Sequence, residues 1–92
     1  MIESRVGITN RLGLHARAAA SLVRTAGRFR SVIRLERCDG TASADAKSIL
    51  SVLMLAASRG TELTLSADGC DEVEANRAVL ALFASGFGEH EQ

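Results

Sequence analysis

The chain has 92 residues, of which 47% are hydrophobic and only 3% are aromatic, so we expect one compact domain with an aliphatic core. Eleven basic residues balance eleven acidic residues, and the lack of a basic excess argues against a nucleic-acid binder. No apolar run reaches the length of a membrane span and the N-terminus lacks a signal-peptide layout, so we expect a cytoplasmic protein without membrane insertion.

The first part of the chain predicts a strand, a loop and a helix. Residues 2–9 alternate between apolar and polar side chains, as a strand with one buried face does. The loop that follows contains Gly13, which is free to take a left-handed backbone conformation. Apolar residues then recur at helical spacing over residues 16–26, and we expect this helix to end at Gly27.

Three further stretches have the alternating pattern of strands. Residues 32–36 form the first of them, and the turn signal Asp39-Gly40 predicts that residues 41–44 pair with it antiparallel. Residues 62–67 alternate most regularly, and they are expected to form the fourth strand of the sheet.

A second helix is expected over residues 46–58, between the third and fourth strands. Its apolar surface is wider than a single stripe, and such a surplus on a short helix would suit the docking of a partner. The expected core stripe consists of Ile49, Val52, Leu53 and Ala56. The apolar residues outside this stripe are Leu50, Met54 and Leu55.

A third helix is expected over residues 70–85, which completes the order β-α-β-β-α-β-α. Four strands and three one-sided helices imply two layers. We therefore expect an α+β fold, an open-faced β-sandwich in which three helices cover one face of a four-stranded antiparallel sheet. Residues 1–89 are expected to form this one domain, and residues 90–92 a short polar tail in which His90 is disordered.

The sequence around His15 suggests chemistry with an anion. Gly13 delivers His15 to the start of the first expected helix, where unpaired N–H groups and the helix dipole favour a phosphate. Arg17 lies in the same turn, and its guanidinium matches phosphate oxygens in a bidentate geometry. His15 could then carry a phosphoryl group on one ring nitrogen. A histidine at a helix start is also often only a cap or a solvated residue, so this stretch alone leaves both interpretations open.

The sequence contains few other candidates for catalytic residues or metal ligands. Cys38 and Cys70 have no metal-ligand spacing to each other or to a histidine, so we expect reduced thiols and no metal site. No Ser-His-Asp constellation can be argued from spacing, and Asp45 and Asp68 are more simply turn residues. We therefore expect no cofactor and no hydrolytic activity.

Four motifs occur in the order and at the spacing of a known family. They are Gly13-Leu14-His15-Ala16-Arg17, Ala44-Asp45-Ala46-Lys47-Ser48-Ile49-Leu50, Gly60-Thr61-Glu62-Leu63 and Gly86-Phe87-Gly88-Glu89. With them the chain closely resembles HPr, the histidine-containing phosphocarrier of the bacterial phosphoenolpyruvate-dependent sugar phosphotransferase system. The resemblance covers essentially residues 5–89.

This resemblance implies a carrier that is not itself an enzyme. His15 matches the histidine whose Nδ1 atom takes a phosphoryl group from Enzyme I and hands it to an A-type enzyme of a sugar permease. Arg17 matches the arginine that stabilises the phosphoryl group, and Ser48 matches a serine that an HPr serine kinase phosphorylates in many members. The residues that match the partner-binding surface of the family are Arg24, Ile49, Leu50 and Leu53. Because a carrier exposes one face to successive partners, we expect a monomer.

The chain also departs from the family pattern. Ala18 stands where many members have a proline, and Gly27 stands where some have a lysine. The first change is expected to leave the site intact because alanine is a strong helix former. Two other functions remain open at this point, namely a regulatory paralogue of the nitrogen-branch type and a docking module that no longer transfers phosphoryl groups.

Overall fold

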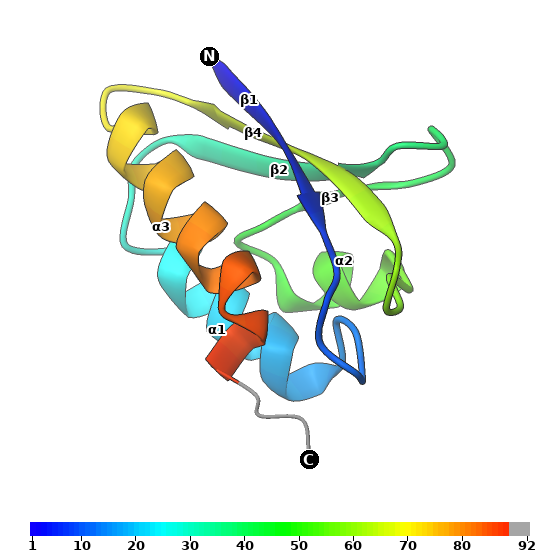
Figure 1. Cartoon of the computed structure of the whole chain (residues 1–92). Helices are drawn as coiled ribbons and strands as arrows, with labels where there is room; N and C mark the ends of the chain where they lie inside the picture. The colour runs from blue at the N-terminus through cyan, green and yellow to red at the C-terminus, as the bar shows by residue number, and fades with distance from the viewer. Residues whose placement is uncertain (89–92) are drawn as a thin grey trace.

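The computed structural model describes residues 1–88, in which three helices lie on one side of a four-stranded sheet (Figure 1). The strand order is β1-β4-β2-β3, and every neighbouring pair is antiparallel. This confirms the predicted α+β open-faced sandwich. The elements are β1 (Ile2–Gly7), α1 (Ala16–Ala26), β2 (Val32–Arg37), β3 (Ser43–Asp45), α2 (Ile49–Met54), β4 (Glu62–Asp68), α3 (Glu72–Ala84) and the 3₁₀ helix η1 (Gly86–Gly88). The predicted tail with His90 lies outside the described residues.

The core lies between the sheet and the helices. Side chains alternate across a strand, so the register that pairs Leu35 with Leu65 places both on the helix side, where both are fully buried. Leu22 of α1 and Val79 of α3 are fully buried against them. The opposite face of the sheet has no helix over it, and its side chains are mostly polar, with Val32 as an exposed apolar residue. Among residues 1–88, no helix combines the length and the apolar character that crossing a bilayer requires.

The second helix is shorter than the prediction. Instead of residues 46–58 it spans Ile49–Met54, because Ser48 caps its start and Ala56, with a left-handed φ of 51°, cannot continue the helix. The expected core stripe was also partly wrong. Val52 is fully buried as expected, but Leu55, which was expected outside the core stripe, is buried as well. The other members of the predicted stripe, Ile49, Leu53 and Ala56, are exposed.

Smaller differences at the ends of other elements have local causes. The third strand begins at Ser43 because Thr41 is used in the turn, where its N–H and hydroxyl donate to Asp39 at 3.0 and 2.6 Å. Helix α1 ends at Ala26 with Gly27 as its cap, which confirms the predicted bounds, although Gly27 keeps a right-handed conformation. Helix α3 begins at Glu72 and not at residue 70.

The late start of α3 reflects the use of Asp71 as a link between two loops. Its Oδ1 accepts hydrogen bonds from the backbone N–H and the hydroxyl of Ser31, at 2.9 and 2.6 Å. Its Oδ2 accepts a third from the backbone N–H of Arg30, at 2.8 Å. The carboxylate therefore fastens the loop before β2 to the loop before α3, over a separation of 40 residues.

Replacing Asp71 with asparagine is expected to destabilise the fold at neutral pH and to make its stability less sensitive to acid. The hydroxyl of Ser31 and then the N–H of Arg30 lower the pKa of Asp71 from 3.8 to about 2. A carboxyl with a lowered folded-state pKa stabilises the fold above about pH 4, and this contribution is lost as the pH falls through its folded-state value. In urea unfolding, the wild type should have a higher free energy of unfolding than Asp71→Asn at neutral pH, and this difference in free energy should become smaller towards about pH 3. A difference that did not change with pH would contradict this assignment.

Candidate functional site

The loop that carries His15 is held against the end of α2. The backbone N–H of Leu14 donates to the carbonyl oxygen of Ala57 at 2.9 Å. Gly13 adopts a φ of 66°, and a Cβ placed on it would lie only 2.5 Å from the same carbonyl oxygen. The turn is closed by Asn10, whose side-chain N–H donates to the carbonyl oxygen of Gly13 at 2.8 Å. Glycine at position 13 thus permits both the left-handed turn and the close approach of two backbones.

His15 is the N-cap of α1. Its backbone is extended, with φ of −75° and ψ of 179°, and its carbonyl oxygen accepts the N–H of Ala19 at 2.8 Å. The Nδ1 atom accepts a hydrogen bond from the backbone N–H of Arg17 at 3.3 Å. This distance is long for an N–H donor, so this hydrogen bond is weak. The half-exposed imidazole therefore presents Nδ1 beside the backbone N–H groups of the first helical turn.

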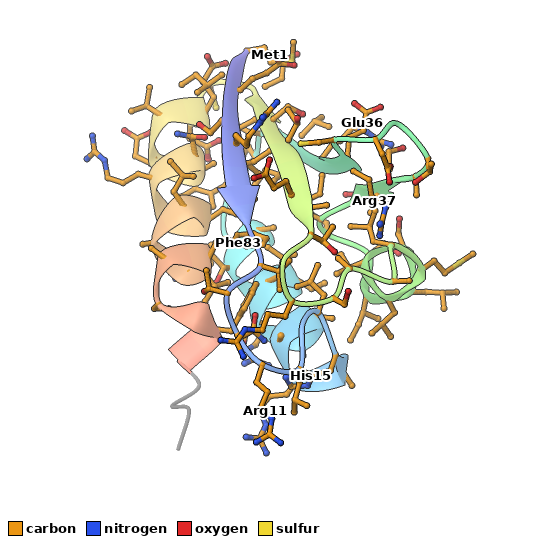
Figure 2. All side chains as sticks on the ribbon, turned by 45° about the vertical axis from the view of Figure 1, so that its right-hand side comes forward. Met1, Arg11, His15, Glu36, Arg37 and Phe83 are labelled. Atoms are coloured by element: carbon orange, nitrogen blue, oxygen red, sulfur yellow. The ribbon has the colours of Figure 1, made fainter. Side chains whose placement is uncertain are left out.

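The first turn of α1 contains no acidic residue, and Arg17 is exposed there. Figure 2 shows Arg11 at the same end of the molecule as His15, opposite Met1. Arg24 is also exposed, but it lies nine residues along α1 from His15, a rise of roughly 13 Å, and donates to Ser21 at 3.3 Å. The positive charge at the imidazole thus comes first from Arg17, while Arg24 extends the basic surface away from it.

An apolar surface lies on α2, the helix whose C-terminal segment supports the His15 loop. Leu50 is 66% exposed and Met54 73% exposed, although both are large apolar residues. We call these two residues together with Ile49 and Leu53 the α2 patch. Leu12, 66% exposed at the tip of the loop before His15, is another exposed apolar residue, and sequence reasoning missed it. The turn formed by Asn10 and Gly13 was the signal that could have revealed Leu12 as a loop tip.

Ser48 is the N-cap of α2, next to the α2 patch. Its hydroxyl oxygen accepts the backbone N–H of Ser51 at 3.3 Å, and the side chain is half-buried. The structure thus gives Ser48 a capping role that needs no modification. The cap position also places any charge added to Ser48 at the end of the apolar patch.

Within residues 1–88, no group of three or more histidine, cysteine, aspartate or glutamate side chains is arranged to hold a metal ion. Cys38 and Cys70 are both exposed and free. The site thus combines the imidazole of His15 with the N-terminus of α1, and Arg17 lies in the first turn of that helix. The α2 patch lies on the helix whose following segment supports the His15 loop.

Comparison of the sequence with known proteins identifies the family to which it is similar. A family model described as the PTS HPr component phosphorylation site matches residues 2–85. A phosphocarrier protein HPr from Cupriavidus necator is 50% identical over 91 residues, which covers 99% of this chain and all of the relative. A phosphocarrier protein NPr from Proteus mirabilis is 45% identical over 85 residues, which covers 92% of this chain and 93% of the relative.

Solved structures give the same result for the fold. An HPr from Thermoanaerobacter tengcongensis superposes with a TM-score of 0.92 at 43% identity, covering 99% of this chain and all of that one. A structure described as a dimer of HPr from the same organism has a TM-score of 0.75 at 44% identity and covers 97% of this chain and all of that one.

Proposed function

Because this chain belongs to the HPr family of phosphocarrier proteins, which are members of a phosphotransferase relay and not enzymes, we propose that His15 is its phosphoryl acceptor. The observation that carries the proposal is the position of Nδ1, at the N-terminus of α1 beside the N–H of Arg17. Phospho-Enzyme I is the proposed donor, and an A-type enzyme of a sugar permease is the proposed recipient.

The geometry supports a direct transfer. The lone pair of Nδ1 attacks the phosphorus atom of the donor, the new N–P bond forms as the donor's bond to phosphorus breaks, and the leaving group keeps that electron pair. The backbone N–H of Arg17 then moves from Nδ1 to a phosphoryl oxygen, because Nδ1 no longer has a lone pair to accept it. The guanidinium of Arg17 adds charge-assisted hydrogen bonds to the same group.

Incubation with Enzyme I and phosphoenolpyruvate tests this function. The intact mass should rise by one phosphoryl group, and the modification should be labile in acid and stable in base. A folded chain that takes no phosphate from a cognate Enzyme I would support the docking-module alternative.

The pathway served by the carrier is a separate question. HPr and NPr relatives both match nearly the whole chain, so a regulatory role of the nitrogen-branch type is a second candidate. Competition between the two types of Enzyme I for the chain distinguishes them, since the cognate donor should have the higher kcat/KM. We further propose that the carrier acts as a cytoplasmic monomer, because successive partners must reach the same face around His15.

The α2 patch, together with Arg24, is the proposed docking surface for these partners. Replacing Leu50 with serine is expected to raise the apparent KM for phospho-Enzyme I roughly tenfold or more, because docking buries this side chain. The unfolding free energy should change by less than about 0.5 kcal/mol, since Leu50 is exposed in the free protein. Val73→Ser removes a half-exposed apolar residue from α3 instead and serves as the matched control. Equal KM values for both variants would contradict the assignment.

Ser48 is proposed as a site of regulation by an HPr serine kinase. Ser48→Asp is expected to fold normally, because aspartate caps a helix as well as serine does, and to accept phosphoryl groups more slowly. A rate reduction of a few-fold that shrinks at high salt would identify the cause as charge. Ser66→Asp places the same charge on β4, in the face of the sheet that no helix covers, and should retain the wild-type rate. Acceptance by Ser48→Asp at the wild-type rate would argue against regulation through charge.

A further inference from the structure

The side chain of Arg37, at the end of β2, is bound to the end of α2. Its Nη1 donates to the carbonyl oxygens of Leu55 at 3.0 Å and Ala56 at 3.5 Å. Its Nε lies 3.5 Å from a carboxylate oxygen of Asp39 in the following turn. Figure 2 labels Arg37 beside this turn, on the side of the molecule where α2 lies. The guanidinium is therefore held between the β2–β3 hairpin and the C-terminal end of α2.

Helix α2 needs such a contact more than the other helices do. It has six residues, too few for a stable isolated helix, and its last turn contains no basic residue. Its final carbonyl groups carry the negative end of the helix dipole, which a cation stabilises. Arg37 supplies a cation to them from strand β2.

The same contact holds a strained part of the chain. Ala56 has a φ of 51°, a conformation that an alanine adopts only at a cost. The next residue, Ala57, accepts the N–H of Leu14 and so supports the loop before His15. Arg37 thus binds the segment that orients the α2 patch on one side and touches the His15 loop on the other.

We propose that Arg37 is a positioning residue for partner docking: by binding the Leu55 and Ala56 carbonyls it holds α2 in the orientation that presents Leu50 and its neighbours. The docking part of this inference rests on the proposed function, whereas the bonds to α2 do not. Arg37 acts through the helix and need not touch a partner. The His15 loop has its own closing bonds at Asn10 and Gly13, so the chemical step should depend less on Arg37.

The test compares Arg37→Met with Arg34→Met. Methionine keeps roughly the aliphatic stem of the arginine side chain and removes every side-chain donor. Arg34 lies on the same strand, carries the same charge and donates only to Ser43 at 3.1 Å, so its replacement is a matched control. With phospho-Enzyme I, Arg37→Met should show an apparent KM raised roughly tenfold and a kcat within about twofold of the wild type. Arg34→Met should show the wild-type KM.

Hydrogen exchange tests the contact without any partner. The amides of Leu55 and Ala56, which donate to carbonyl oxygens in α2 at 3.1 Å, should exchange roughly tenfold faster in Arg37→Met. The amide of Leu65, in the central strand β4, should exchange at the wild-type rate. Unchanged exchange at Leu55 and Ala56 would overturn the inference.

A double-mutant cycle with Leu50→Ser separates positioning from direct contact. If Arg37 acts by orienting the patch, its effect on KM should largely disappear once Leu50 is replaced, whereas a direct contact with the partner would give additive effects. Additivity, or an unchanged KM in Arg37→Met, would refute the positioning role. Failure of the wild-type chain to accept any phosphoryl group would instead refute the proposed function. The hydrogen-exchange measurement would still show whether Arg37 stabilises the end of α2.

Discussion

Replacing His15 with alanine is expected to abolish phosphorylation by Enzyme I and phosphoenolpyruvate completely. Alanine has no lone pair that can attack phosphorus, so no N–P bond can form, and neither Arg17 nor the helix N-terminus can substitute for the nucleophile. Intact-mass measurement in alkaline solution, where a phosphohistidine survives, should show only the unmodified chain. The chain has a second histidine, His90, which makes a direct control possible. His90→Ala should be phosphorylated as fully as the wild type.

Loss of folding is a competing explanation for an inactive His15 variant, and the N-cap position allows it to be tested. The imidazole accepts the N–H of Arg17, so its removal should cost about 0.5–2 kcal/mol of stability. Asparagine is a preferred N-cap residue but has no nucleophilic ring nitrogen. His15→Asn should therefore unfold close to the wild-type urea midpoint and still accept no phosphate. An acid-labile phosphate on either His15 variant would show that another residue is the acceptor.

Replacing Gly13 with alanine is expected to destabilise the protein by roughly 2–4 kcal/mol. Part of this cost, about 1 kcal/mol or more, comes from forcing an alanine into the left-handed region. The rest comes from the methyl group, which would lie 2.5 Å from the carbonyl oxygen of Ala57 and 2.8 Å from Cα of Ser58. Both neighbours are backbone atoms, so the clash can be relieved only by moving the loop away from the end of α2.

Gly40→Ala is the matched control for Gly13. Gly40 has a similar φ of 77°, but nothing lies within 4 Å of an added Cβ, so this variant should show the conformational cost alone. The difference between the free energies of unfolding of the two variants, measured in urea, gives the energetic cost of the steric clash at Gly13. Because that approach supports Leu14 and hence His15, Gly13→Ala should also accept phosphoryl groups more slowly while folded. Equal unfolding free energies for the two variants would contradict the packing described for this loop.

Several features of the fold could be predicted because their signals are local. The alternation over residues 62–67 predicted β4 to within one residue, and the apolar spacing over residues 16–26 predicted α1 with its observed bounds. Asp39-Gly40 correctly predicted the hairpin. The placement of His15 at the start of α1 followed from its position between a turn glycine and strong helix formers. These signals depend on backbone conformation within a few residues.

Helix α2 shows where local signals stop being sufficient. Its apolar residues are so numerous that several stripes fit the helical period, and only packing against the sheet decides that Val52 and Leu55 are buried while Leu50 and Met54 are exposed. Its end is set by the left-handed conformation of Ala56, a residue whose carbonyl oxygen Arg37 contacts. No spacing in the sequence connects residue 37 with residue 56.

The sequence by itself thus determined the order of the elements, the hairpin turn, the left-handed glycine before His15 and the family resemblance. The tertiary structure alone decided the bounds of α2, the face that it exposes, the role of Asp71 between two loops and the contact of Arg37 with the end of α2. The physical reason is the range of the interactions involved. Turns, helix caps and hydrophobic periodicity depend on residues that are neighbours in the chain. Burial, and the binding of a helix end by a residue such as Arg37, depend on which distant segments the folded chain places in contact.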